Sequence, residues 1–216
     1  MRAHVPEFGD EPYPDDGTVQ VYAPIDLALN PELAAALPTW RTRIEEATTG
    51  YEVAVVGDDK IHVTVDVWTG FSAGQITRPQ LETVATRLRG DLAQSPAYLG
   101  AAGPALAYGS SIRLDICPAA PLIKIQRQVH HGLAAERGPA AARWRQPKPH
   151  ISQAFWRDRE VCGEPIQRAL TQIDPAHVPL RIHELVMAVV LFNRSAATGE
   201  DYFQWHTVAR IPLGAA

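Results

Sequence analysis

Two histidines in this chain lie in nearly the same local sequence. The segment from Lys60 to Trp68 reads KIHVTVDVW, and the segment from Lys148 to Trp156 reads KPHISQAFW. Lysine, histidine and tryptophan coincide, and a hydroxyl residue, threonine or serine, lies two positions after each histidine. Two imidazoles can share proton transfer at a phosphate ester, because one ring accepts a proton while the other donates one. The repeat therefore predicts acid–base chemistry on a phosphate.

Both copies have the composition of a β-strand, in which side chains alternate between two faces. The alternation predicts that four side chains of the first copy share one face: His62, Thr64, Asp66 and Trp68. In the second copy it places His150 beside Ser152. A histidine and a hydroxyl residue two positions apart lie roughly 6–7 Å from each other at Cα, close enough for both to touch one phosphate. We therefore expect catalytic roles for the two histidines and phosphate contacts from Thr64 and Ser152.

The basic residues near the two copies have competing interpretations. Lys60 and Lys148 share the face of their histidines and could attract phosphate at the mouth of a groove, although solvated lysines at strand ends are common. Arg143, Trp144 and Arg145 precede the second copy and form a basic and aromatic cluster with Lys148. They could engage a nucleotide, or form a loop that only packs its tryptophan.

Other residues near the repeat favour structural roles. Asp66 is four strand residues from His62, roughly 13 Å, so we do not expect it to orient that ring. The tryptophan that ends each copy is expected in the core. His130 and His131 are adjacent on a predicted helix and diverge by about 100°, so they cannot grip one metal ion together and are expected to be exposed.

Length and composition restrict the class of protein. The 216 residues suit one domain or two small lobes, and the net charge of −4 argues against a protein that coats duplex nucleic acid. Cys117 and Cys162 are too few for a disulfide scaffold or a cysteine zinc site, and we expect both to be buried. No apolar stretch approaches the roughly 18–20 residues of a membrane span, and no signal-peptide pattern is present. We expect a soluble, cytoplasmic protein.

The remaining sequence predicts the elements that position the repeat. Residues 1–17 are expected to be a flexible leader, followed by a single domain at 18–216. Strands are predicted at 18–25, 51–56, 60–68, 104–108, 111–117, around the second copy, and at 180–192 and 202–211. Helices are predicted from Asn30, with a break near Pro38, from the capping box at Thr77, at 122–137 and at 162–173. This order indicates an α+β fold with mostly antiparallel sheet and two similar halves.

With two H-x-[ST]-x motifs about ninety residues apart, the chain resembles the 2H (two-histidine) phosphoesterase superfamily, especially the bacterial 2′-5′ RNA ligase and RNA 2′,3′-cyclic phosphodiesterase branch. His62-Val-Thr64-Val matches the first motif and His150-Ile-Ser152-Gln the second, with serine in place of the commoner threonine. Pro149, directly before His150, and the pattern of the C-terminal hairpin also resemble this family. The resemblance implies two pseudo-symmetric antiparallel lobes, backed by helices, whose motifs face one central groove.

The resemblance also implies residue roles. The first histidine, His62, would donate a proton to the leaving ribose oxygen, and His150 would be the base that activates water. Thr64 and Ser152 would hold phosphate oxygens, and no metal or cofactor would be needed. The leading hypothesis is a phosphodiesterase that opens 2′,3′-cyclic phosphates on nucleotides or RNA ends, reversible as a 2′-5′ ligase.

Two other functions remain open at this point. A non-catalytic protein of the same fold could bind a nucleotide or RNA end without turnover. A metal-dependent hydrolase is the weaker alternative, because the sequence has no H-x-x-x-H pattern and no cysteine pair. We expect a monomer that binds a cyclic-phosphate nucleotide or RNA end and neither duplex DNA nor a membrane.

Overall fold

The computed structural model describes residues 7–8, 11–12, 16–69, 71–109, 111–138, 147–156, 163–194 and 201–214. Its helices are α1 (Pro31–Ala47), α2 (Arg78–Leu92), α3 (Ala120–Arg137) and α4 (Gly163–Leu170). Its strands are β1 (Glu7–Phe8), β2 (Glu11–Pro12), β3 (Thr18–Pro24), β4 (Val53–Val55), β5 (His62–Val67), β6 (Tyr98–Tyr108), β7 (Ser111–Cys117), β8 (His150–Trp156), β9 (Val178–Ile182), β10 (Glu184–Arg194) and β11 (Asp201–Pro212).

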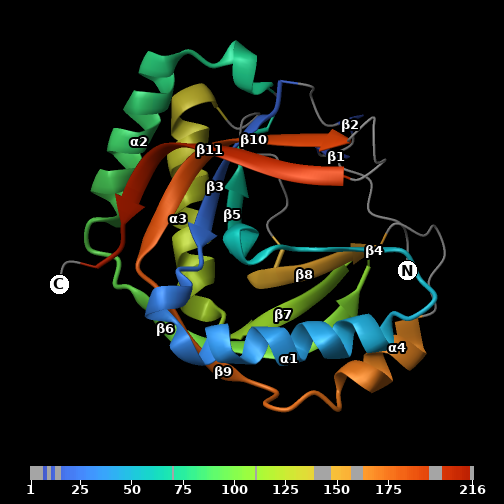
Figure 1. Cartoon of the computed structure of the whole chain (residues 1–216). Helices are drawn as coiled ribbons and strands as arrows, with labels where there is room; N and C mark the ends of the chain where they lie inside the picture. Colours follow the sequence, from blue (N-terminus) through green and yellow to red (C-terminus); the bar gives the residue numbers. More distant parts are fainter. Residues whose placement is uncertain are drawn as a thin grey trace.

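Two antiparallel sheets make up the body of the protein (Figure 1). One has the strand order β11-β10-β3-β5, and the other has the order β4-β8-β7-β6-β9. The first motif strand, β5, is an edge of the four-stranded sheet, whereas the second, β8, lies inside the five-stranded sheet. The two motif strands contact each other where the sheets meet. The predicted α+β bilobal architecture is confirmed.

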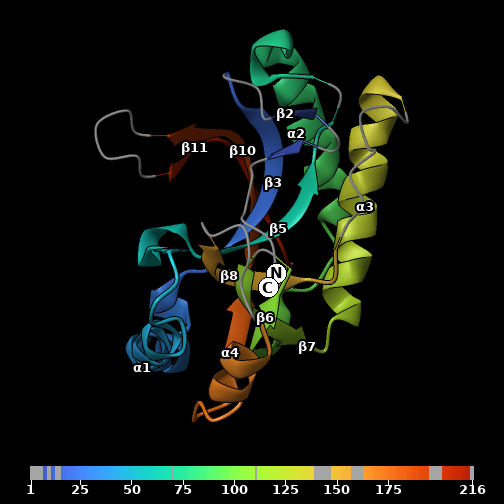
Figure 2. The same ribbon diagram turned by 90° about the vertical axis from the view of Figure 1, so that its right-hand side faces the viewer.

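The helices form two groups, one for each sheet. Helices α2 and α3 pack together, against β11 and β5 respectively, and α1 packs with α4 against β9 and β6. Figure 2 shows the first pair on one side of the molecule and the second pair on the other. The capping box predicted at the start of α2 is present, because the Thr77 and Gln80 side chains each accept the other residue's backbone N–H. No helix in the described part of the chain is long and apolar enough to cross a bilayer.

One apolar cluster joins the two sheets to all four helices. Its largest members are Trp40, Trp68 and Trp156, each no more than 1% exposed. Fully burying a large apolar side chain contributes roughly 1.5–3 kcal/mol, so these positions are among the main sources of stability. The predicted core role of the tryptophans that end the two copies is confirmed.

Helix α1 runs without interruption through Pro38, so the predicted break is wrong. Proline inside a helix costs roughly 3 kcal/mol, because it removes one hydrogen bond and crowds the preceding turn. The buried stripe of α1 lies on both sides of this proline and includes Leu33, Leu37, Trp40 and Ile44. Burying those side chains offsets the local cost, which the sequence pattern could not weigh.

The single strand predicted at 180–192 is two strands that belong to different sheets. Strand β9 pairs with β6, and β10 pairs with β3 and β11, with His183 between them. Ile182 and Leu185 are both fully buried, so the apolar pattern continues across the change of sheet.

Cys117, which we expected to be buried, is exposed at the end of β7, and Cys162 lies outside the described residues.

The expected leader at 1–17 lies mostly outside the described residues. Within it, β1 pairs with β2. The Asp16 carboxylate accepts hydrogen bonds from Ser72 Oγ at 2.7 Å and from the Gly74 N–H at 3.0 Å. The boundary between leader and domain near residue 18 stays a prediction.

Candidate active site

Each motif strand contains a β-bulge directly after its hydroxyl residue. On β5, Thr64 pairs with Tyr22 and Asp66 pairs with Val21, so Val65 is the extra residue. On β8 the matching register shift leaves Gln153 as the extra residue, between the pairs Arg113–Ser152 and Ile112–Ala154. A bulge re-aims the side chains that follow it and is common beside active sites. The two copies thus share a backbone irregularity as well as a sequence.

The bulge overturns the simple alternation predicted for the first copy. Val65 and Asp66 are both buried, and Asp66 points toward α3, where His130 Nδ1 lies 3.0 Å from its carboxylate. Asp66 therefore does not share the face of His62, and His130 is not the exposed residue that we expected. The adjacent His131 is exposed. Within the described residues, no group of three or more histidine, cysteine or acidic side chains is placed to hold a metal ion.

Each candidate histidine is held by the carbonyl of the lysine two residues before it. His62 Nδ1–H donates to the Lys60 carbonyl at 2.7 Å, and His150 Nδ1–H donates to the Lys148 carbonyl at 2.8 Å. A carbonyl oxygen can only accept, so this contact places the proton of the neutral ring on Nδ1. Nε2 then carries the lone pair in both rings and is the atom available for proton transfer.

The two rings are close enough to influence each other. Burial lowers the pKa of His62 to about 4, the Lys60 carbonyl acts in the opposite direction, and the charge of His150 lowers this pKa further. Burial also lowers the pKa of His150, against the effect of the Lys148 carbonyl; the charge of Arg113 adds to the lowering, and the charge of Asp115 opposes it. The structure thus brings together the two histidines that the repeat singled out, and it favours their neutral forms.

The surroundings of His62 are aromatic. The Tyr22 ring centroid lies 4.1 Å from that of the imidazole, and the Trp205 ring meets it edge-on at 5.3 Å. The Lys60 ammonium lies 4.8 Å from the Trp205 ring centroid and 3.3 Å from an Asp59 oxygen. Both aromatic rings cover the imidazole and so contribute to the burial that lowers the pKa of His62.

The surroundings of His150 are charged. An Arg113 terminal nitrogen, Nη1, lies 3.4 Å from Nδ1 of this histidine, and the Arg113 guanidinium carbon lies 3.6 Å from the Tyr108 ring centroid. The Lys148 ammonium is 2.5 Å from the Asp115 carboxylate. Sequence reasoning missed Arg113, although Arg113 and Asp115 form a polar row on an otherwise apolar strand, a signal that could have drawn attention to this face.

The candidate phosphate-binding hydroxyls belong to the residues two positions after the histidines, on β5 and β8. Thr64 and Ser152 are half-buried, and neither hydroxyl has a hydrogen-bond partner among the described residues. Both are therefore available to a ligand. The basic and aromatic cluster at Arg143, Trp144 and Arg145 lies outside the described residues.

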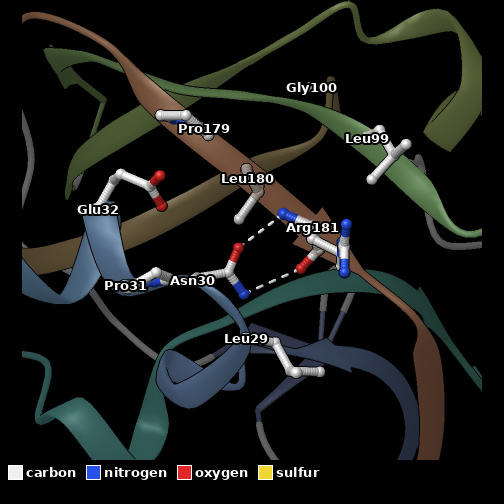
Figure 3. A pocket seen from close by; sticks show the side chains of 9 residues that line it. All are labelled: Leu29, Asn30, Pro31, Glu32, Leu99, Gly100, Pro179, Leu180 and Arg181. Atoms are coloured by element: carbon white, nitrogen blue, oxygen red, sulfur yellow. Dashed lines mark hydrogen bonds between the residues drawn. The ribbon is translucent and has the colours of Figure 1, made fainter.

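Two surface hollows differ in their relation to this site. One has a volume of about 240 Å³, lies at the ends of β3, β10 and β11, and includes Trp205, which contacts His62. The other lies at the free edge of β9 (Figure 3). There the Asn30 side chain accepts from the Arg181 N–H at 2.6 Å and donates to the Arg181 carbonyl at 3.1 Å, which closes the sheet edge. The second hollow is thus a structural junction.

Comparison with known proteins bears on the fold. No protein-family model matches the sequence, and the search of curated proteins gives no match. The solved structure of E. coli LigT with 3′-AMP aligns with a TM-score of 0.60 at 16% identity, over 92% of this chain and 99% of LigT. The protein TT0787 of Thermus thermophilus aligns with a TM-score of 0.61 at 11% identity, over 91% and 97% of the two chains.

A third solved structure, described as a phosphoesterase, aligns with a TM-score of 0.58 at 13% identity, over 92% of this chain and 99% of its own. Each of these three alignments covers nearly the whole of both chains. The structure therefore confirms the predicted resemblance at the level of architecture: this chain has the fold of the 2H phosphoesterases.

Proposed function

We propose that this protein is a metal-independent phosphodiesterase that opens 2′,3′-cyclic phosphates on nucleotides or RNA ends. The observation that carries the proposal is a pair of histidines with matching hydrogen bonds. Each donates its Nδ1–H to the carbonyl of the lysine two residues before it, and each is followed two residues later by a hydroxyl without a hydrogen-bond partner among the described residues. Solved structures of the similarly folded LigT hold 3′-AMP, ATP, NADP+ and phosphate, which supports a nucleotide ligand here.

The proposed reaction is an in-line displacement at phosphorus. His150 Nε2 accepts a proton from water as the water oxygen bonds to phosphorus, and protonated His62 donates its Nε2 proton to the ribose oxygen as the phosphorus–oxygen bond breaks. The product is a phosphomonoester beside a free hydroxyl. Thr64 and Ser152 donate hydrogen bonds to the other phosphate oxygens, where charge develops. A 2′-5′ ligase would use the same residues, with the 5′-hydroxyl of a second RNA end attacking phosphorus in place of water.

Before substrate binds, the electrostatics of the site favour the neutral form of both rings. At His150 burial is the largest cause of the lowered pKa; the Arg113 charge lowers this pKa further and the Asp115 charge opposes it. His62 has a pKa of about 4 without ligand and is mostly neutral at pH 7. A bound phosphate anion raises the pKa of a neighbouring imidazole, because opposite charges stabilise each other. His62 would therefore take up its proton together with the substrate.

The test is turnover of a substrate panel by the purified chain. The panel contains 2′,3′-cyclic nucleotides, 3′,5′-cyclic nucleotides and an RNA oligonucleotide with a 2′,3′-cyclic end, and the products are identified by mass spectrometry. We expect opening of the 2′,3′-cyclic compounds, with and without EDTA, and its loss in His62→Ala.

Other results would point to the remaining functions. Thermal stabilisation by a cyclic nucleotide without turnover would favour the non-catalytic binding protein. Activity that EDTA abolishes and added zinc or manganese restores would refute the metal-independent mechanism.

A further inference from the structure

We propose that Arg113 is a phosphate-binding residue of this site, whose guanidinium holds the non-bridging oxygens of the cyclic phosphate beside His150. The inference rests on the proposed function and deepens it. It places the negatively charged phosphate oxygens of the substrate in the half of the pseudo-symmetric site that contains His150.

The position of Arg113 follows from strand register. It lies on β7 directly opposite Ser152, at the bulge of β8, and its Nη1 is 3.4 Å from His150 Nδ1. The guanidinium therefore lies next to His150, and Arg113 itself pairs with the residue that carries the candidate hydroxyl. A phosphate that accepts a hydrogen bond from the Ser152 hydroxyl would lie within reach of this cation.

The guanidinium has donors that the protein does not use. Its Nε is buried and has no hydrogen-bond partner, and no ion pair of Arg113 occurs among the described residues. Its contact with His150 is not a hydrogen bond to an acceptor, because Nδ1–H already donates to the Lys148 carbonyl at 2.8 Å. The nearby Asp115 carboxylate is engaged by Lys148. A half-buried cation with unused N–H groups is the arrangement expected where an external anion completes the site.

Tyr108 keeps the guanidinium in a defined plane. The tyrosine is 61% exposed, and its ring centroid lies 3.6 Å from the guanidinium carbon. Stacking uses the face of the guanidinium and leaves its N–H edge free, which is the edge that binds two phosphate oxygens at once. A lysine at this position would keep the charge but lose the fork of donors.

The matching position in the first half of the site carries no charge. Tyr22 pairs with Thr64 across the β5 bulge as Arg113 pairs with Ser152 across the β8 bulge. Tyr22 presents an aromatic ring to His62, whereas Arg113 presents a cation to His150. The negatively charged oxygens are therefore drawn toward the His150 half, and the leaving ribose oxygen lies toward His62.

The experiment compares Arg113→Gln, Arg113→Lys and Tyr108→Leu with the wild type and with Arg181→Gln, a matched control at an exposed arginine of the same sheet. Inorganic phosphate is titrated into each protein while the imidazole NMR signals are followed, and kcat/KM is measured on a 2′,3′-cyclic nucleotide. We expect Arg113→Gln to weaken phosphate affinity and kcat/KM by roughly 10- to 100-fold, the range for one hydrogen-bonded charge. Arg113→Lys and Tyr108→Leu should lose less, and the control should match the wild type.

Thermal unfolding separates a binding role from a structural one. Because the buried Nε lacks a partner, Arg113→Gln should keep or raise the melting temperature, whereas a structural arginine would lower it. Wild-type phosphate affinity in Arg113→Gln, or no phosphate binding by the wild type, would overturn the inference. Phosphate binding that depends on Arg113 in a protein without turnover would uphold the inference and refute the proposed activity.

Discussion

The low pKa of His62 predicts that acid destabilises the folded protein through this side chain. An unfolded histidine has its ordinary pKa of 6.5, whereas the folded protein holds that of His62 at about 4. Between these values the unfolded chain binds a proton that the folded chain excludes, so the free energy of unfolding falls as pH falls from about 6.5 to about 4. Each tenfold change in proton affinity corresponds to about 1.4 kcal/mol, which gives roughly 3 kcal/mol in total.

The assay is urea unfolding of the wild type and of His62→Gln at several pH values between 7 and 4. Glutamine does not titrate, so the wild type should lose roughly 3 kcal/mol more stability than the variant across this range. The variant also loses the hydrogen bond to the Lys60 carbonyl, which can change its stability at pH 7. This does not affect the test, because only the change in stability with pH is compared. Thr64→Ala, on the same strand and without a titratable group, is the matched control and should follow the wild type.

The same experiment can refute the reasoning. If His62→Gln loses as much stability as the wild type between pH 7 and 4, then burial beside Tyr22 and Trp205 does not exclude the proton. A direct check is the pH titration of the His62 imidazole signal by NMR. A midpoint near 6.5 without ligand would contradict the burial argument in the same way.

Three further predictions concern the site and the sheet edge. Replacing His62 or His150 by alanine should slow turnover by roughly 10²–10⁴-fold in steady-state assays, and full activity in the double variant would place the chemistry elsewhere. Thr64→Ala and Ser152→Ala should each reduce kcat/KM by about 10-fold, less than the histidine changes, because proton transfer stays intact. Asn30→Ala should lower the free energy of urea unfolding by about 1–3 kcal/mol, since it leaves the backbone edge of β9 unpaired, and unchanged stability would contradict that role.

The repeat predicted the site's residue pairs because both copies keep a lysine, a histidine and a hydroxyl at fixed positions. Local signals also predicted α2, whose capping box and apolar stripe agree with each other. The two bulges were not predicted: Val65 fits an ordinary strand, and Gln153, which interrupts the apolar row of the second copy, has no counterpart in the first. One extra residue on β5 is nevertheless enough to turn Asp66 away from His62 and toward His130.

The remaining differences arise where tertiary packing decides between local alternatives. Helix α1 continues through Pro38 because large apolar side chains on both sides of it are buried against the second sheet. The break at His183 separates two buried strands whose apolar pattern is continuous in the sequence. The proposed role of Arg113 depends on its pairing with Ser152, a contact between strands that no local pattern specifies.

The structure separates what the two halves of the site share from what distinguishes them. The lysine carbonyl, the Nδ1 hydrogen bond and the bulge after the hydroxyl residue are common to both halves, so both rings present Nε2 in the same way. Identical presentation alone cannot make one ring an acid and the other a base. In the proposed mechanism, one source of that difference is the residue opposite each hydroxyl, which is Tyr22 in one half and Arg113 in the other. A neighbouring cation disfavours a protonated imidazole, as Arg113 does at His150, whereas burial is the largest cause of the low pKa of His62. The proposed acid role of His62 therefore requires a bound phosphate to raise that pKa, in addition to the difference between these two positions on β3 and β7.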